Sequence, residues 1–376
     1  MFSSLDHAMM QRAITLAKNG QFTTAPNPNV GCVIAHGEEI VGEGYHYQAG
    51  QPHAEVFALR AAGERARGAT AYVTLEPCSH YGRTPPCAEA LVKAGVGRVV
   101  CAMVDPNAKV AGRGVTILQQ AGIEVQVGLL EADALALNKG FIQRMKTGRP
   151  FVQLKLAASL DGRTALANGK SQWITSAPAR ADVQRFRAKA GAILSTSATV
   201  LADDPSLNVR WADLGETVQQ HYPEANLRQP VRVIIDSQNR VTPAHRLVSL
   251  PGKTLLARAN ADTQAWPKDV QQLEVATEAT GQLDLVALME TLAAQDINHV
   301  WVEAGAGLAG GLLKAGLVDE LIVYQAPKLM GSDSRGLIDL NGLTEMAEVP
   351  ALAITDVRMV GPDIRITARI NTTEQK

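Results

Sequence analysis

Residues 4–144 alternate between helical and strand patterns, and this alternation constrains the fold more than any other feature of the chain. Apolar residues at helical spacing follow the candidate cap Ser4 and predict an opening helix. Two β-rich runs, 30–35 and 39–44, flank a short turn and predict a hairpin. Helix and strand patterns then alternate to give five strands in all. This pattern predicts an α/β domain with helices on the faces of a largely parallel sheet and loops at one edge.

The segment 146–150 marks the end of this domain, because Gly148 can end a helix and Pro150 cannot extend one. We therefore expect two domains, 1–147 and 148–376, and a chain of 376 residues is long enough for both. We interpret the polar stretch 208–229 as a surface excursion. The strand signals of the second domain lie at 152–157, 192–195, 231–235, 299–302 and 320–324.

Charge and aromatic content argue against a nucleic-acid partner. Lys and Arg number 36 against 37 Asp and Glu, and aromatic residues make up only 4% of the chain. The N-terminus lacks the features of a signal peptide, and no apolar run reaches the length of a membrane span. We therefore expect a cytoplasmic protein with a small-molecule partner. In a reducing compartment, four cysteines indicate metal binding or core packing rather than disulfides.

A candidate metal site begins at His53 and Glu55, which open a helical pattern. Cys78 follows the strand signal 72–75, and Cys87 begins the next helical pattern. One imidazole and two thiolates give three zinc ligands and leave a fourth position for water, as in catalytic rather than structural sites. Glu55 lies two residues from the histidine. It can accept the proton of the water and return it to a departing amine.

This combination resembles the zinc nucleobase-deaminase signature, in which His-x-Glu precedes Pro-Cys-x-x-Cys and the Glu transfers the proton. It departs from the signature because eight residues, not two, separate Cys78 from Cys87. Three alternatives stay open: an incidental grouping of these residues, a binding module with a purely structural zinc, and a nucleic-acid editor with the same pocket. Glu55 beside an open coordination position argues against the second, and the near-neutral charge argues against the third.

The segments 76–87, 26–31 and 42–46 resemble the deaminase half of the bifunctional riboflavin-biosynthesis deaminase-reductases. The resemblance implies a three-layer α/β/α domain of the cytidine-deaminase type. It also implies that Asn27, His46 and Arg83 contact the pyrimidine or the ribose phosphate of the substrate. Turn formation, strand-end packing and a solvated cation are the respective alternatives for these residues.

A strand signal, a glycine turn and a helical pattern follow one another over residues 300–313, an arrangement that can hold a phosphate. Gly305, Gly307 and Gly310 satisfy G-x-G-x-x-G, but the acid that a conventional dinucleotide fold places about 20 residues further on is missing. A conventional Rossmann unit is therefore disfavoured. Close packing of helix on strand explains Gly310 and Gly311 almost as well as phosphate binding does.

The segments 155–164, 171–176 and 199–205 resemble the reductase half of the same family, an α/β domain similar to dihydrofolate reductase. The resemblance implies that NADPH is held by Ala157, Trp173, Thr199, Asp203, Gly305, Ala306, Gly307, Leu308, Ala309, Gly310 and Gly311. Ser237 is a further candidate for binding a phosphate of the cofactor. The following residues would hold the substrate: Lys155, Ser171, Arg187, Leu207, Arg210 and Glu303. The alternatives are a solvated helix face for Arg187, a core indole for Trp173 and a turn at 203–205.

The sequence and the resemblance together predict two successive reactions. One catalytic Zn²⁺ per chain would support hydrolytic deamination of a diaminopyrimidinone ribosylamino 5′-phosphate. NADPH would then reduce its ribose to a ribityl chain. We also expect a homo-oligomer, either a dimer or a tetramer. The compounds come from the resemblance, whereas the residues alone indicate a zinc hydrolase joined to a nucleotide-binding domain.

Overall fold

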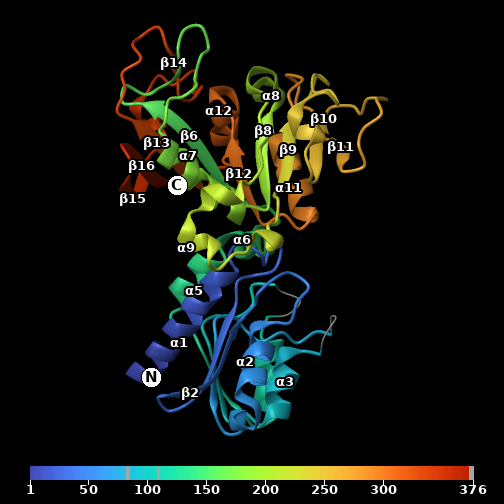
Figure 1. The fold of residues 1–376 in the computed structure, drawn as a ribbon, viewed down its shortest axis with the longest axis vertical. Coiled ribbons are helices and arrows are strands. Elements are labelled where there is room, and N and C mark those ends of the chain that lie inside the picture. Colours follow the sequence, from blue (N-terminus) through green and yellow to red (C-terminus); the bar gives the residue numbers. More distant parts are fainter. Residues whose placement is uncertain (82–84, 108–110, 372–376) are drawn as a thin grey trace. The chain divides into compact units, whose positions relative to one another are not determined.

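The computed structural model describes residues 1–81, 85–107 and 111–371. The chain divides into two compact units, Met1–Gly148 and Arg149–Lys376 (Figure 1). Gly148 follows helix α6 (Lys139–Thr147) and adopts a left-handed conformation with φ of 74°, which glycine tolerates without a steric penalty. No helix in the described part of the chain is long and apolar enough to cross a membrane.

The first unit contains a sheet whose order, within the described ranges, is β2-β1-β3-β4-β5. Strand β1 pairs antiparallel with both β2 and β3, whereas β3, β4 and β5 are parallel. The expectation of five strands is confirmed, but the expectation of a largely parallel sheet is wrong, because the opening hairpin reverses the chain beside β3. The strands are β1 (Gly31–His36), β2 (Glu39–Tyr45), β3 (Thr70–Val73), β4 (Arg98–Cys101) and β5 (Glu124–Val127).

Helices cover both faces of this sheet and make three layers (Figure 1). One core lies between the sheet and α1 (Ser4–Ala17), α5 (Glu131–Leu137) and α6. The other lies between the sheet and α2 (Ala54–Ala62), α3 (Cys87–Ala94) and α4 (Arg113–Gln120). Ser3, not the predicted Ser4, caps α1, since its hydroxyl accepts the N–H of Asp6 while the Asp6 carboxylate accepts the N–H of Ser3.

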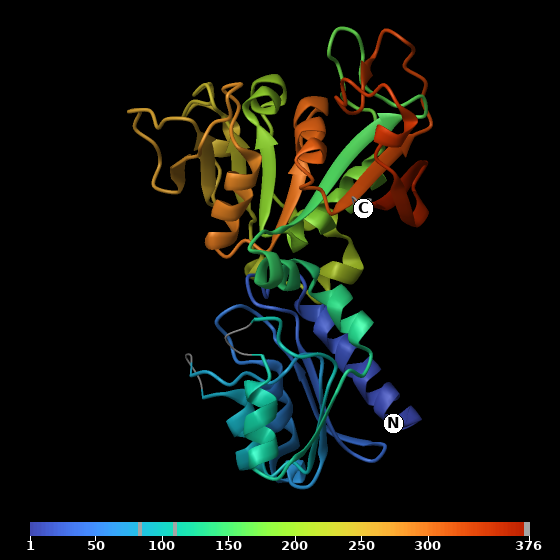
Figure 2. The same ribbon diagram turned by 180° about the vertical axis from the view of Figure 1, so that it is seen from behind.

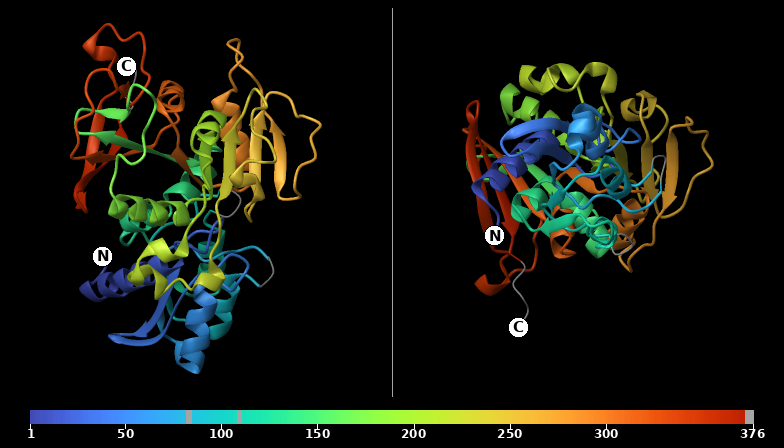
Figure 3. Two further views of the ribbon diagram at one scale, coloured as in Figure 1. Left: turned by 45° about the horizontal axis from the view of Figure 1, so that its top comes forward. Right: turned by 90° about the horizontal axis from the view of Figure 1, so that it is seen from below.

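The second unit is built on a sheet whose order, in the described part of the chain, is β11-β10-β9-β8-β12-β6-β13-β16-β15. The strands from β11 to β13 are parallel, and β16 and β15 continue the sheet antiparallel. Figure 3 shows β16 and β15 at one end of the sheet and β10 and β11 at the other. The strands are β6 (Phe151–Ser159), β8 (Ala192–Thr196), β9 (Val231–Ile235), β10 (Thr254–Arg258), β11 (Val270–Glu274), β12 (His299–Glu303), β13 (Glu320–Ala326), β15 (Leu352–Val360) and β16 (Asp363–Ile370).

Two cores flank this sheet as well. Helices α11 (Leu285–Ala294) and α12 (Ala306–Lys314) cover one face, and α7 (Ala177–Lys189) covers the other (Figures 1 and 2). The carboxyl ends of the parallel strands meet at one edge, where ligand sites of open α/β sheets form. The remaining elements are α8 (Ser197–Asp203), α9 (Glu216–Gln219), α10 (Arg246–Ser249) and the short pair β7 (Arg163–Ala165) and β14 (Arg335–Gly336).

Candidate functional sites

The fold of the first unit brings His53, Cys78 and Cys87 together. His53 is the N-cap of α2, Cys78 lies beyond β3, and Cys87 is the first residue of α3. Nδ1 of His53 lies 3.5 Å from Sγ of Cys78 and 3.4 Å from Sγ of Cys87. The three donor atoms all lie within 4.8 Å of one another. One imidazole nitrogen and two converging sulfurs are a donor set that fits zinc and leaves a fourth position free.

The two cysteines differ in their electrostatic environment. The backbone N–H of Cys87 donates to Sγ of Cys78 at 3.3 Å. Hydrogen bonding from Cys87, together with the neighbouring His53, lowers the pKa of the Cys78 thiol to about 4. The negative sulfur of Cys78 and burial raise the pKa of the Cys87 thiol. One proton is thus held between two sulfurs, and a bound divalent cation would displace it.

Glu55 is buried beside this donor set. The residue is 3% exposed, and Oε2 of its carboxyl group has no hydrogen-bond partner among the described residues. Burial raises the pKa of Glu55 to about 7, although the charge of His53 opposes the shift. A buried carboxylate oxygen without a partner is costly unless a ligand completes the site. The site therefore fits a metal ion with a polar ligand next to Glu55.

The structure also places Asn27 and His46 next to His53. Nδ2 of Asn27 donates to Nε2 of His46 at 3.0 Å, and Nδ1 of His46 donates to the carbonyl of Pro52 at 3.0 Å. The rings of His46 and His53 meet edge to face, with centroids 5.4 Å apart. Burial lowers the pKa of His46, which favours the neutral imidazole that these two hydrogen bonds require. The third substrate candidate of this unit, Arg83, lies outside the described residues.

The sequence analysis missed Glu76, which precedes the Pro77-Cys78 pair. Its buried carboxylate accepts backbone N–H groups from the segment that leads into α4, at 2.8 to 3.3 Å. These bonds tie the cysteine loop to a helix of the same unit. A Glu directly before Pro-Cys is the sequence signal, but only the fold reveals its partners: Asp105, Gly112, Gly114 and Val115.

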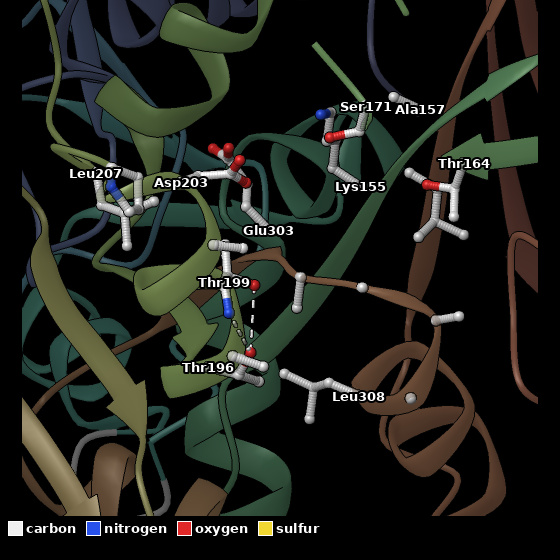
Figure 4. A pocket seen from close by; sticks show the side chains of 18 of the residues that line it. Lys155, Ala157, Thr164, Ser171, Thr196, Thr199, Asp203, Leu207, Glu303 and Leu308 are labelled. Carbon is white, nitrogen blue, oxygen red and sulfur yellow. Dashed lines mark hydrogen bonds between the residues drawn. The ribbon is translucent and has the colours of Figure 1, made fainter. Parts of the chain in front are cut away.

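A cavity of about 1750 Å³ opens at the carboxyl ends of the strands of the second unit (Figure 4). All six candidate substrate residues line it, as do ten of the twelve candidate cofactor residues. Ala309 and Gly310 do not line it, because both are buried on the inner side of α12. A Cβ at Gly310 would lie 2.1 Å from the carbonyl oxygen of Asp339, so this glycine serves close packing.

Arg187 and Glu303 form a buried ion pair in the cavity wall. Nε and Nη2 of Arg187 donate to the two carboxylate oxygens of Glu303 at 2.6 and 2.8 Å. The indole N–H of Trp301 donates to the same carboxylate at 2.7 Å. Burial by itself would raise the pKa of Glu303, but Arg187 and the charge of Lys155 outweigh it and lower the pKa to about 2. Burial lowers the pKa of Lys155, whose charge Glu303 helps to retain.

Other candidates lie around the same cavity. The hydroxyl of Thr196 accepts the backbone N–H of Thr199 at 3.3 Å, which fixes the start of α8 (Figure 4). Trp173 is 64% exposed and stacks under the guanidinium of Arg180 at 4.6 Å, so it is not a core indole. Arg187 is not a solvated helix residue, because it is bound to Glu303. Arg210 is exposed at the cavity rim and pairs with Asp213 at 2.6 Å.

Converging metal donors beside a buried acid in the first unit, and a large cavity at the strand ends of the second unit, are typical of a deaminase followed in the chain by a nucleotide-dependent reductase. Residues 3–103 match the cytidine and deoxycytidylate deaminase zinc-binding region. Residues 150–366 match the RibD C-terminal domain. The fold class expected from the sequence, a cytidine-deaminase-like unit followed by an α/β reductase unit, is confirmed.

Whole-length relatives share this two-unit organisation. The chain is 63% identical to riboflavin biosynthesis protein RibD of Escherichia coli over 359 residues, which cover 96% of this chain and 98% of that protein. It is 54% identical to the Haemophilus influenzae protein of the same name, over 97% of this chain and 98% of the relative. The chain therefore belongs to the RibD family, and it is a bifunctional deaminase and reductase of riboflavin biosynthesis.

Solved structures support the same family assignment. The chain matches Acinetobacter baumannii RibD with a TM-score of 0.88 and 46% identity, over 98% of this chain and 99% of that one. It matches a diaminohydroxyphosphoribosylaminopyrimidine deaminase/5-amino-6-(5-phosphoribosylamino)uracil reductase of Thermotoga maritima with a TM-score of 0.84 and 31% identity, over 97% and 99%. The first unit is a zinc-binding deaminase, and the reductase unit uses NADPH, as in this family.

Proposed function

We propose that residues 1–147 deaminate 2,5-diamino-6-ribosylamino-4(3H)-pyrimidinone 5′-phosphate, and that residues 148–376 then reduce the ribose to give 5-amino-6-ribitylaminouracil 5′-phosphate. The name of the Thermotoga maritima relative, which matches nearly the whole chain, supports these compounds. The observation that carries the proposal is the unpartnered Oε2 of buried Glu55 beside three converging metal donors. A site built only to hold a structural metal has no use for such an acid.

In the deaminase unit, His53, Cys78 and Cys87 would hold a zinc ion, which when bound would supply Lewis-acid activation of water. Oε2 of Glu55 accepts the proton of the attacking water, because this atom has no competing partner among the described residues. The raised pKa of Glu55 suits an acid that must also release the proton to the departing amine. The water oxygen adds to the ring carbon, and the C–N bond to the exocyclic amine then breaks as Glu55 returns the proton to that nitrogen, so ammonia leaves.

We assign substrate binding in this unit to Asn27, His46 and Arg83. The contact between Asn27 and His46, edge on to His53, supports a role for both beside the reacting carbon. Asn27 can orient the polar edge of a pyrimidine, and a neutral His46 can do so without adding a cation next to the metal. The assignment of Arg83 rests on the family resemblance, and its guanidinium would suit the 5′-phosphate.

In the reductase unit, NADPH supplies the hydride and the chain positions the two reactants. We assign the turn 305–308 and Gly311, with Ala157, Trp173, Thr199, Asp203 and Ser237, to cofactor binding, because all of them line the cavity. Gly305, at the N-cap of α12, leaves room for a phosphate, since a Cβ there would meet no atom within 4 Å. The substrate residues are Lys155, Ser171, Arg187, Leu207, Arg210 and Glu303, and their charges suit a sugar phosphate.

An exposed apolar sheet face supports a homodimer. Ile354 and Met359 of β15 are 63% and 64% exposed, and they pair with Ala368 and Ile364 of β16. Arg365, the next residue along β16, binds Asp182 of α7 at 2.7 Å, so α7 covers the opposite face. We propose that two copies pack these faces together. The apolar sheet face comprises Leu352, Ile354, Val357, Met359, Ile364, Ile366 and Val323.

We place the enzyme in the cytoplasm, because its four cysteines are free and a thiolate zinc site requires reducing conditions. A nearly balanced charge of 36 basic and 37 acidic residues supports a free nucleotide rather than a nucleic acid as substrate.

The proposal is tested by giving the purified chain the diaminopyrimidinone phosphate with and without NADPH. Ammonia release and NADPH oxidation are followed separately. We expect ammonia in both reactions and NADPH oxidation only after deamination. NADPH oxidation without ammonia release would reverse the order, and ammonia release that requires NADPH would contradict two separable sites. Activity on single-stranded DNA that falls steeply with salt would favour an editor instead.

A further inference from the structure

The cavity of the reductase unit holds a second polar cluster, and of its residues only Ser237 has been assigned to the cofactor above, without a stated contact. It lies where β9 and β8 end, and it consists of Ser237, Arg240 and Ser197. All three residues line the cavity. Nη2 of Arg240 donates to the hydroxyl of Ser197 at 2.9 Å. We propose that this cluster binds the 2′-phosphate of NADPH and makes the reductase select NADPH over NADH.

The direction of the cofactor in the cavity follows from the order of the strands, and this step rests on the function proposed above. The nicotinamide must adjoin the substrate, whose candidate contacts Lys155 and Glu303 lie on β6 and β12. The glycine turn after β12 takes the diphosphate. The adenosine half then extends away from β6 and toward β8 and β9, because the sheet order is β9-β8-β12-β6.

The distance between the glycine turn and the cluster suits the adenosine ribose of NADPH, which carries the diphosphate on one side and the 2′-phosphate on the other. Only β8 lies between β9 and β12, so these two strands are two spacings of about 4.8 Å apart, and the turn and the cluster are roughly 10 Å apart. Ile235, the last residue of β9, lines the cavity two positions before Ser237, and Leu283 and Leu285 also line the cavity. Ile235 offers an apolar surface for the adenine ring beside the phosphate cluster.

Arg240 is the cation in this region that is best placed for a phosphate. Among the described residues it makes no ion pair, whereas Arg187 and Arg210 of the same cavity are bound to Glu303 and Asp213. A guanidinium without a carboxylate partner keeps its donors for a ligand, and its planar fork matches phosphate oxygens. NADH lacks the 2′-phosphate and gains nothing from this contact.

Hydrogen bonds to a buried carboxylate fix the loop that carries Arg240. The buried carboxylate of Asp236 accepts the backbone N–H groups of Arg240 and Val241 at 2.8 and 3.1 Å. Arg258, which is fully buried, donates to the same carboxylate at 2.9 Å. These bonds fix the loop before any ligand arrives. The arginine therefore loses less conformational entropy on binding than a residue on a mobile loop would.

The test measures binding rather than turnover, with the full-length, zinc-loaded chain in a calorimeter. The probes are NADPH, NADH, 2′,5′-ADP and 5′-ADP, and the variants are Arg240→Gln and Arg335→Gln. Arg335 is the matched control, because it lines the same cavity but belongs to β14, away from the cluster. We expect Arg240→Gln to weaken NADPH and 2′,5′-ADP roughly ten- to a hundredfold, as for loss of a charge-assisted contact.

NADH and 5′-ADP should bind the Arg240→Gln variant as they bind the parent, and Arg335→Gln should change none of the four affinities. If Arg240→Gln lowered the affinities for NADPH and NADH equally, Arg240 would only shape the loop. Unchanged NADPH binding in this variant would also overturn the proposal. A loss of affinity for NADPH but not for NADH in Arg335→Gln would place the 2′-phosphate site at β14 instead. If the parent bound neither NADPH nor 2′,5′-ADP, the cofactor cavity itself would be misassigned and this inference would fail with it.

Discussion

The buried pair between Arg187 and Glu303 gives a prediction whose size follows from the structure. Its surroundings lower the pKa of Glu303 to about 2. An unperturbed Glu titrates near 4.3, so the shift of about two units corresponds to roughly 3 kcal/mol of stability when the carboxylate is charged. Glu303→Gln keeps the shape of the side chain but leaves the Arg187 guanidinium buried without its counter-charge. We expect this variant to lose about 3 kcal/mol of unfolding free energy at pH 7.

The pH dependence has a defined sign. Because the folded-state pKa is lowered, the contribution of Glu303 is complete above its unfolded pKa and disappears as the pH falls toward about 2. The difference between parent and variant should therefore be the same at pH 7 and pH 6, and it should shrink by about half at pH 3. Urea titrations can measure this in the full chain, because all four tryptophans lie in the reductase unit and their fluorescence reports its unfolding alone. Equal midpoints at pH 7, or a difference that does not shrink in acid, would refute the reasoning.

Four further predictions concern single positions. Cys87→Ser should lower bound zinc, measured by metal analysis, well below one ion per chain, because a three-donor site loses a thiolate; normal zinc and ammonia release would remove Cys87 from the ligand set. Gly310→Val should destabilise the reductase unit by more than about 2 kcal/mol in urea, since its Cβ would overlap a backbone carbonyl. Gly307→Val, with no such overlap, should instead fold normally and bind NADPH more weakly in calorimetry; the opposite order would contradict the packing seen here. If two copies pair through the apolar sheet face as proposed, Met359→Lys should lower the mass in sedimentation to that of a monomer, and an unchanged mass would place any interface elsewhere.

The first unit could be predicted closely from its sequence because its strands and helices are separated by clear turn signals. The hairpin at 36–38 and the helix end at Gly148 are local features that tertiary contacts do not override. The direction of the strands was harder to predict, because the pairing of β1 with β3 joins segments that are distant in the chain.

The ends of the larger sheet were harder to predict. The strand signals that we used were apolar runs, and they correspond to β6, β8, β9, β12 and β13 in the structure. Four strands near the sheet ends, β10, β11, β15 and β16, were missed. Of these, β15 and β16 alternate apolar with polar or charged side chains, as half-covered strands do, and β11 is largely polar. Their place in the sheet depends on neighbours rather than on their own sequence.

The convergence of His53, Cys78 and Cys87 could be predicted because residue type and context agree over a short span, whereas the contacts of Glu76 and Arg240 could not. Both contact groups far away in the chain: Glu76 accepts the backbone N–H groups of Asp105, Gly112, Gly114 and Val115, and Arg240 donates to a serine 43 positions earlier. Gly305 and Gly307 have no positive φ in the structure, so the turn needs glycine for space rather than for backbone conformation.

The central claim, that Glu55 moves protons at a zinc site separate from the reductase, is tested most directly by Glu55→Gln. Zinc content, ammonia release from the diaminopyrimidinone phosphate, and NADPH oxidation with the deaminated intermediate are measured on one preparation. We predict one zinc per chain, ammonia release lowered at least about a hundredfold, and NADPH oxidation at the parental rate. Loss of zinc, or ammonia release near the parental rate, would contradict the role of Glu55, and loss of NADPH oxidation would contradict the separation of the two sites.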